Sequence, residues 1–318
     1  MDNIAHTLSG LAVRDLAPKN LFKSKAFLWV AILIASAPDI DILAWFFGQD
    51  AYFRFHRGIT HSVFLIPFWG FLGALIVYYA SRKKVSFVKS GLWYSMIIVV
   101  HLTMDWVTSY GTELFAPFTH KTYSANLFPI VDLWIILPLS LLSFIGKFYN
   151  DRRRTFSIGV LIFLIFLTGF RLFSKMRSES LIIERYGHSD KIVSFADIES
   201  WREWLNPSIY RVVTVHGDSA ISYKVVPHTG NVICQNSFDL FSTDDEYWDE
   251  AYRYNLSKNY LDRSELPIAG VLGDRFLISD LRYTSELASN SSLTVYFPLI
   301  GDTISGPPKM LRPEPQSR

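Results

Sequence analysis

Residues 56–80 read HRGITHSVFLIPFWGFLGALIVYYA and join a polar motif directly to an apolar run. The stretch 62–80 is long enough to cross the hydrocarbon core of a bilayer, which takes about 20 residues. Further stretches of this kind are 91–110, 130–149 and 155–174, and a fifth, 26–47, is interrupted by PDID. We therefore expect an integral membrane domain, the alternative being a buried all-helical core of a soluble protein.

The composition supports a membrane domain followed by a different kind of domain. Of the 318 residues 16% are aromatic and only 19% are charged, and the apolar residues lie mostly before residue 175. The net charge of +2 does not indicate nucleic-acid binding. The one cysteine, Cys234, allows neither an internal disulfide nor a thiolate zinc site. The first residues do not resemble a signal peptide, so we expect the first helix to be retained.

Basic residues predict the orientation in the membrane. The positive-inside rule places the connections that carry them on the cytoplasmic side and the loops 48–60 and 111–129 on the other side. We expect a multi-pass protein of the cell (inner) membrane whose residues after 175 are extracytoplasmic, although the basic stretch 170–177 argues mildly against this orientation. The three basic connections contain Arg14, Lys19, Lys23 and Lys25; Arg82, Lys83, Lys84 and Lys89; and Lys147, Arg152, Arg153 and Arg154.

The expected fold is an all-α multi-spanning membrane helix bundle, residues 1–175, followed by a small soluble β-rich (α+β) domain, residues 176–305. Alternating segments such as YRVVTVHG and SLTVYFP are typical of half-buried strands. A connector, FADIESWREWL at 195–205, has a helical pattern. The Pro-rich residues 306–318 are expected to be a disordered tail.

Ionisable residues inside membrane segments are costly and mark a functional site or a pairing network. On a helix, residues four apart share one face, and this spacing recurs in Asp2 and His6 and in His101 and Asp105. Measured by helical rise from the nearest basic connection, groups from five segments lie in the half of the bundle away from the cytoplasm. A half-helix at 3–13 would bring its residues to the same level. The remaining members are Asp39 and Asp41 after Pro38, where a helix break is expected, His56 and His61 around Arg57, and Asp132.

Imidazole and carboxylate ligands without thiolate favour zinc, with one or two ions. The candidate ligands are His6, Asp39, His56, His61, His101, Asp105 and Asp132. A metal activates water near neutral pH and stabilises the oxygens of a phosphoester, and Arg57 would bind the anion. Alternatives stay open for each motif: HRGITHS as a polar loop, HLTMD as a His–Asp pair that locks helices, PDID as a solvated turn, and Asp132 as a helix-starting acid.

The motifs MDNIAHTLSG, APDIDIL, HRGITHS, HLTMDWVTSYGTELFAPF and IVDLW, in this order, resemble the YdjM/YbcI-like family of membrane-bound metal-dependent hydrolases. The resemblance covers about residues 1–175 and implies a multi-spanning hydrolase fold with a His/Asp metal centre. Carried over by motif, it points to Asp2, His6, Asp39, Asp41, His56, His61, His101 and Asp105, with Asp132 less secure. The strand-rich segment lies outside it.

The expected function is a membrane-embedded metal-dependent hydrolase that acts on a lipid or lipid-linked phosphoester through metal-activated water. Asp41 or Asp2 would be the general base. The expected partners are membrane lipid and a lipid or lipid-linked substrate, without nucleic acid; the sequence does not identify a protein partner. One alternative is a metal-ion or proton transporter with an intramembrane His/Asp site. Another is a membrane anchor for an extracytoplasmic binding module.

Overall fold

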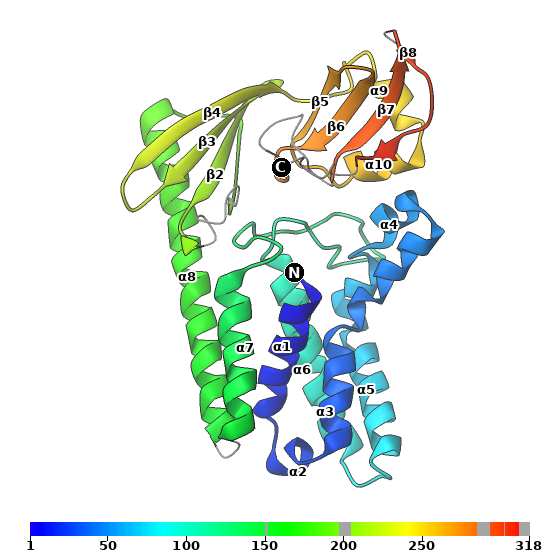
Figure 1. The fold of residues 1–318 in the computed structure, drawn as a ribbon, viewed down its shortest axis with the longest axis vertical. Coiled ribbons are helices and arrows are strands. Elements are labelled where there is room, and N and C mark those ends of the chain that lie inside the picture. The colour runs from blue at the N-terminus through cyan, green and yellow to red at the C-terminus, as the bar shows by residue number, and fades with distance from the viewer. Residues whose placement is uncertain (150–151, 197–204, 285–292, 302, 312–318) are drawn as a thin grey trace, which may run out of the picture. The chain divides into compact units, whose positions relative to one another are not determined.

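A computed structural model describes residues 1–149, 152–196, 205–284, 293–301 and 303–311. The chain divides into two compact bodies. The first body consists of Met1–Ile42, Arg57–Met176 and Ala196–Ile209, and the second consists of Leu43–His56, Arg177–Phe195 and Tyr210–Arg318. A helical N-terminal region is followed by a β-rich region with two sheets (Figure 1), which confirms the predicted fold class.

The helical region contains long helices and short 3-10 turns. Its elements are α1 (Asn3–Asp15), α2 (Lys19–Phe22), α3 (Lys25–Ala35), η1 (Pro38–Phe47), α4 (Gln49–Phe55), η2 (Ile59–His61), η3 (Val63–Leu65), α5 (Ile66–Ala80), α6 (Phe87–Trp106), α7 (Leu133–Phe148) and α8 (Arg153–Tyr186). Ser62 caps η3, and the long helix α5 begins only at Ile66.

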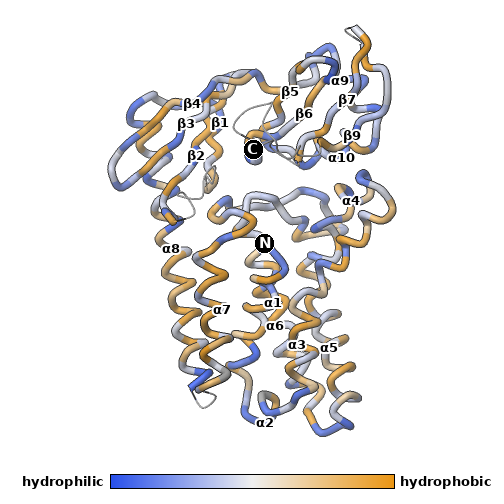
Figure 2. The backbone as a smooth tube through the Cα atoms, viewed as in Figure 1, coloured by the Kyte–Doolittle hydropathy of each residue, from blue (hydrophilic) through white to orange (hydrophobic). Residues whose placement is uncertain are grey.

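Three helical segments are long and apolar enough to span a membrane: Val63–Ala80, Phe87–Trp106 and Arg153–Tyr186. The pair α3 and η1 passes the same test as one span bent by 52°, and Leu133–Gly146 is a shorter apolar helix. Figure 2 shows the hydrophobic colouring along these helices. On α8 the side chains of Ile162 and Ile165 are 62% and 73% exposed, as expected for a lipid-facing surface. Four of the predicted spans and the break before Pro38 are confirmed, whereas the stretch 130–149 contains only the shorter apolar helix.

Small residues bring the spanning helices close together. A Cβ atom added at Gly70 of α5 would lie 2.0 Å from Ser95 Oγ and 2.9 Å from the Gly91 carbonyl oxygen of α6. At Gly10 of α1 it would lie 2.5 Å from the Ala35 Cβ of α3. Close backbone approach through glycine is a common way for helices to associate in lipid, where the hydrophobic effect gives no drive.

Helix α1 is the half-helix expected from the sequence. Its 13 residues rise about 20 Å, less than the roughly 30 Å of a bilayer core. It contacts α3, α6 and α7, and lies among them in Figure 1. The Asp2 carboxylate caps its first turn by accepting from the amides of Ile4 and Ala5. At its other end Asp15 accepts from Arg14 and from Arg153 of α8, which ties the end of α1 to α8.

The second body contains two antiparallel sheets in the strand orders β1-β2-β3-β4 and β5-β6-β7-β8, with β9 pairing to β7. Phe53 of α4 is buried in the core that the second sheet shares with α9 and α10. The strands are β1 (Lys191–Ala196), β2 (Tyr210–His216), β3 (Ser219–Val226), β4 (Asn231–Asp239), β5 (Pro267–Leu272), β6 (Arg275–Asp280), β7 (Val295–Ile300), β8 (Thr303–Ile304) and β9 (Lys309–Met310), and the helices are α9 (Trp248–Tyr252) and α10 (Asn255–Leu261).

Three predictions from the sequence concern this body and its boundaries. The expected boundary after residue 175 lies close to Arg177, the residue of α8 from which the chain belongs to the second body. This body also includes the earlier segment Leu43–His56. Part of the expected disordered tail forms β9, and its last residues, 312–318, lie outside the described residues. The expected helical connector falls largely on residues 197–204, which also lie outside them.

Candidate metal centre

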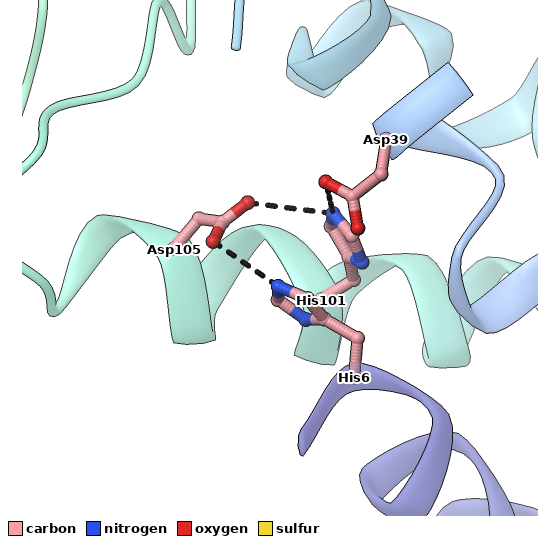
Figure 3. A group of neighbouring side chains, drawn as sticks. All are labelled: His6, Asp39, His101 and Asp105. Atoms are coloured by element: carbon pink, nitrogen blue, oxygen red, sulfur yellow. Dashed lines mark hydrogen bonds and ion pairs between the residues drawn. The ribbon is translucent and has the colours of Figure 1, made fainter. Parts of the chain in front are cut away.

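Four ligand-type side chains from three elements meet inside the first body. His6 comes from α1, Asp39 from η1, and His101 and Asp105 from α6 (Figure 3). One ligand atom from each lies within 4.8 Å of all the others, and all four residues are buried. The four-residue spacing places His101 and Asp105 on one face of α6, and the break after α3 brings Asp39 to them.

The separations are close to those of a metal coordination shell. His6 Nε2 lies 3.2 Å from Asp105 Oδ1, and His101 Nε2 lies 3.4 Å from Asp105 Oδ2 and 3.7 Å from Asp39 Oδ1. Ligand atoms about 2.0–2.2 Å from one tetrahedral ion are about 3.4 Å apart. The rings of His6 and His101 stack with their centroids 3.8 Å apart, so both imidazoles reach the carboxylates from the same side.

His61 is a fifth member of the group, and Asp41 orients it. Its Nε2 lies 3.3 Å from Asp39 Oδ1, 3.2 Å from Asp105 Oδ2 and 3.3 Å from His101 Nε2. Its Nδ1 lies 3.0 Å from Asp41 Oδ2. That Asp41 oxygen also accepts from Thr60 Oγ1. One ring nitrogen therefore faces an orienting carboxylate and the other faces the cluster, the arrangement that holds many metal-ligating histidines.

The hydrogen bond of His101 fixes which of its nitrogens can serve as a ligand. Its Nδ1 lies 2.8 Å from the carbonyl oxygen of Ala35, and since a carbonyl only accepts, Nδ1 carries the proton. In the neutral ring, Nε2 then presents a lone pair to the carboxylates of Asp39 and Asp105. A lone pair and a carboxylate oxygen at such distances repel each other unless a proton or a metal cation lies between them.

Arg57 is buried beside this group in the left-handed backbone region, at φ 53. Its Nη2 lies 2.9 Å from Asp105 Oδ1, its Nη1 donates to Thr108 Oγ1 at 3.1 Å, and its guanidinium lies 5.0 Å from the ring centroid of Tyr110. Its backbone N–H donates to Asp41 Oδ2 at 2.8 Å. A non-glycine residue at positive φ costs about 1–2 kcal/mol, so these contacts must hold it there.

The residues present fit a divalent cation. The Met1 amino group and the Arg57 guanidinium pair with Asp105, whereas Asp39 faces the cluster, where a cation shared with the imidazoles would neutralise it. Among the described residues, neither Asp39 Oδ2 nor His6 Nδ1 has a hydrogen-bond partner, although both atoms are buried. Buried carboxylates and imidazoles without thiolate form a donor set that suits zinc and similar ions.

The structure brings together seven of the residues expected from the sequence: His6, Asp39, Asp41, Arg57, His61, His101 and Asp105. Three others are not in this group, and two of them, His56 and Asp132, lie elsewhere. The ring of His56 stacks on Tyr52 with centroids 4.7 Å apart, in the second body. Asp132 caps α7 and pairs with Arg171 Nη2 at 2.5 Å. Asp2 caps α1.

Several residues around the centre were not anticipated. Thr60 and Thr108 hold Asp41 and Arg57, and Tyr110 lies under the Arg57 guanidinium. Thr108 follows Asp105 by three positions and donates to its carbonyl oxygen at 2.8 Å. In the sequence, this spacing of a hydroxyl residue one helical turn after a candidate ligand would have indicated that Thr108 lies beside the cluster.

The helical region that contains the cluster matches a known protein family. The family model described as YdjM inner membrane protein matches residues 1–178, which include the whole cluster. The curated relative "Uncharacterized protein YfhP" of Bacillus subtilis (strain 168) is 27% identical over 213 residues, 64% of each chain. The chain thus matches less than two thirds of that relative's length. No solved structure matches the chain.

Proposed function

The chain belongs to the YdjM inner membrane protein family, and from that premise we propose that it is a membrane-embedded metal-dependent hydrolase acting on a lipid or lipid-linked phosphoester. One observation carries the proposal: imidazoles and carboxylates from α1, η1, η2 and α6 meet at coordination distances inside a membrane helix bundle. Buried ionisable groups are costly in a bundle of this kind and are retained where they have a function.

His6, Asp39, His101 and Asp105 would hold the metal, for which we propose zinc, and His61 would complete this shell or take part in holding a second ion. Such a metal acts as a Lewis acid toward a phosphoryl or carbonyl oxygen and makes water a nucleophile near neutral pH. The protein's part is to fix the ligands. Asp41 does so for His61, and the Ala35 carbonyl does so for His101.

Arg57 is the proposed anion-binding residue. Two of its guanidinium nitrogens are used by Asp105 and Thr108, whereas its buried Nε has no hydrogen-bond partner in the part of the chain that the structure describes. A buried donor without a partner is costly, and a phosphate oxygen would satisfy it. This favours a phosphoester substrate, whose negative charge would pair with Arg57, over an uncharged ester.

Asp2 is the better of the two proposed general bases. Asp41 accepts from the Arg57 amide and Thr60 and contacts His61, so it is occupied as an orienting group. Asp2 uses Oδ1 to cap α1, while its Oδ2 is buried without a hydrogen-bond partner among the described residues. An oxygen with free acceptor capacity is the one able to take a proton from water.

The sequence of α6 supports placing the centre near the outer leaflet. The helix begins after the basic connection that contains Lys84, and His101 and Asp105 lie near its other end. Between Lys89 and His101 the chain carries no Asp, Glu, His, Lys or Arg. A proton or metal path through the bundle would need such groups toward both faces, so this gap disfavours the transporter alternative. From the positive-inside rule we also propose that the second body is extracytoplasmic.

The test combines metal analysis with a substrate screen. Full-length protein purified from zinc-supplemented cells should contain one or two transition-metal ions per chain, and His101→Ala and Asp105→Asn should lose most of this metal while retaining helical content. Vesicles of phospholipids and lipid pyrophosphates should release product with wild type only. Asp274→Asn is the control, because its carboxylate is 86% exposed in the second body. Wild-type protein that holds no metal, or whose metal content the two variants leave unchanged, contradicts the proposal.

A further inference from the structure

A row of exposed phenylalanines runs along the apolar span Val63–Ala80 from its beginning. Phe64, Phe68 and Phe71 are 54%, 51% and 54% exposed. Their spacing of four and then three residues places them on one side of the helical segment. Large apolar side chains exposed on one side of a spanning helix are the surface that hydrocarbon covers in a bilayer. The row therefore marks the side of α5 that faces lipid.

A non-helical segment, residues 114–118 with the sequence LFAPF, continues this row beyond the end of the span. The ring of Phe118 packs edge-on against Phe64 with the centroids 5.1 Å apart, and Phe118 is 79% exposed. Phe115 is 40% exposed, whereas Ala116 between the two is only 1% exposed. One side of the segment thus faces the protein, and the other presents aromatic rings outward. Exposed apolar surface of this kind marks a contact with a partner or a membrane.

The backbone of the segment suits surroundings that contain little water. The Leu114 carbonyl accepts from the Val63 amide at 2.9 Å, and the Ala116 carbonyl accepts from Ser62 Oγ at 2.6 Å. Pro117 has no N–H to satisfy. Irregular backbone is tolerated next to hydrocarbon only where the protein satisfies its polar groups. These hydrogen bonds allow the segment to approach the acyl chains without leaving those carbonyl groups unpaired.

The same hydrogen bonds attach the segment 114–118 to the motif that carries the site residues. Its two partners directly follow His61, and just ahead of it the Glu113 amide donates to the Arg57 carbonyl at 3.0 Å. Ile59, which lies between Arg57 and His61 in the chain, is 50% exposed. All of these residues belong to the first body. Apolar surface therefore reaches from the lipid-facing side of α5 to the neighbours of the proposed anion-binding residue.

We propose that the segment 114–118 lies in the bilayer at the end of the bundle where α5 begins, and that a membrane lipid reaches Arg57 past it. Continuity with the lipid-facing row of α5 identifies the occupant of the aromatic surface as phospholipid of that leaflet. Lys121, exposed three residues after Phe118, suits the headgroup level, where lysine keeps its charge in water above an apolar surface. The lipid contact is independent of the proposed function, whereas the access role rests on it.

The lipid contact is tested by measuring depth in full-length protein in phospholipid nanodiscs. Cys234 is the one cysteine and is exposed, so Cys234→Ser provides a background for labelling at one site. Nitroxide labels are attached to Phe118→Cys, Lys121→Cys and Ile165→Cys in that background. Their relaxation by oxygen, which concentrates in hydrocarbon, is compared with relaxation by a water-soluble nickel chelate. Ile165, 73% exposed on the span in α8, is the lipid reference, and Lys121 is the matched water reference in the same loop.

The label at Phe118 should resemble the label at Ile165, with stronger relaxation by oxygen than by the nickel chelate. The label at Lys121 should show the opposite order. A Phe118 label that responds to the chelate as strongly as the Lys121 label overturns the proposal. A Phe118 label that responds to neither agent is covered by protein, which also overturns it and makes a protein surface the occupant.

The access role is tested by comparing substrates that differ only in their chains. For a lipid that the vesicle screen identifies, KM is measured with the long-chain form and with a water-soluble short-chain form of the same headgroup. Phe118→Ser should raise the ratio of the first KM to the second about tenfold, the lower end of what burial of a phenylalanine contributes. Phe118→Leu, which remains apolar, should keep the ratio near that of wild type, and the bound metal should be equal in all three proteins.

The possible failures are distinguishable. A ratio that Phe118→Ser leaves unchanged overturns the access role, while the depth measurement decides the lipid contact. Wild-type protein that hydrolyses neither form of any lipid contradicts the proposed function and the access role together. The nitroxide measurement needs no activity, so in that case too it either supports or overturns the placement of the segment in the bilayer.

Discussion

The Asp41 carboxylate lies 3.0 Å from Nδ1 of His61, while Nε2 of the same ring lies 3.2 Å from Asp105. The two residues are joined further through Thr60, whose hydroxyl donates to Asp41. Asp41 thus determines which way the imidazole points and which nitrogen carries the proton. Two carboxylates of one PDID motif take different positions as a result: Asp39 lies in the cluster and Asp41 lies behind one of its histidines.

Asp41→Asn should weaken metal binding about 10–100-fold while leaving the fold intact. The amide can donate to His61 Nδ1, which would move the ring proton to Nε2 and block the nitrogen that faces the cluster. Competition with a chelator measures the change, and circular dichroism checks the fold. Unchanged affinity would show that the orientation of His61 does not depend on this carboxylate.

The two histidines of HRGITHS should respond differently to the same substitution. His61→Phe removes an imidazole that contacts Asp39 and Asp105 and should lower the metal content at least about tenfold. His56→Phe should retain the metal, because phenylalanine preserves the stack on Tyr52. Elemental analysis of both purified proteins tests this, and equal loss in the two variants would return His56 to the ligand set.

Asp132→Asn should reduce stability rather than metal affinity. The carboxylate pairs with buried Arg171, whose guanidinium also lies 4.7 Å from the ring centroid of Phe128. Leaving a buried charge without its partner costs about 3–5 kcal/mol. Unfolding in detergent should show the loss, and metal titration of the folded fraction should match wild type. Weaker metal binding with wild-type stability is the result that contradicts this assignment.

Gly70→Ala should destabilise the helix bundle by about 1–3 kcal/mol, the usual cost of overpacking. The added methyl group meets Ser95 Oγ and the Gly91 carbonyl oxygen, and a backbone atom cannot rotate away. Gly159→Ala in α8 is the control, since nothing lies within 4 Å of its Cβ position, and it should be neutral or slightly stabilising. Thermal unfolding in detergent measures both. Equal stability of the two variants would show that the α5 and α6 backbones can separate without cost.

Asp280 and Arg282 should give the second body an acid-sensitive stability. Burial alone would raise the pKa of Asp280, but the Arg282 guanidinium and the amides of Arg282 and Glu265 outweigh it, so this pKa lies below its ordinary value. The unfolded chain, with an aspartate pKa of about 3.9, then binds protons first as the pH falls. The stabilisation is therefore complete above about pH 5 and is lost progressively as the pH falls below about 4 and through the lowered pKa of the folded state.

Denaturant unfolding of wild type and Asp280→Asn between pH 3 and pH 7 measures this contribution. The variant should be about 3–5 kcal/mol less stable at pH 7, because it leaves the Arg282 charge buried without its partner. The difference should narrow toward pH 3. Asp274→Asn, whose carboxylate is exposed, should follow wild type throughout. A stability difference that stays constant with pH would exclude the linkage.

Local sequence patterns were sufficient for most of the spanning helices and for bringing most of the His/Asp cluster together. His101 and Asp105 lie on one helix, so their spacing alone places both on one face. His6 and Asp39 were matched by estimating depth from the basic connections, which works because a helix rises uniformly. The break before Pro38, which turns Asp39 inward, was also visible in the sequence.

The residues that were placed differently depend on long-range contacts that no local pattern records. His56 stacks on Tyr52 because α4 packs in the C-terminal body, and its neighbour Phe53 meets Tyr260 far along the chain. In the sequence, the basic stretch 170–177 argues mildly against the predicted orientation. In the structure Arg171 pairs with Asp132, and Lys175 donates to the carbonyl oxygen of Ala125, so both cations serve contacts within the helical body.

The hydrogen bond from Arg263 to the His56 carbonyl joins residues that are 207 positions apart, and this separation sets an order of events during biosynthesis. The ribosome delivers the membrane helices and all candidate ligands first, and domains generally fold as units in the order of their synthesis. Within the second body, the His56 carbonyl and the Phe53 ring can meet their partners only once Arg263 and Tyr260 have emerged. Helix α4 is therefore synthesised before the core to which it belongs, and its packing in the second body is a late step of folding.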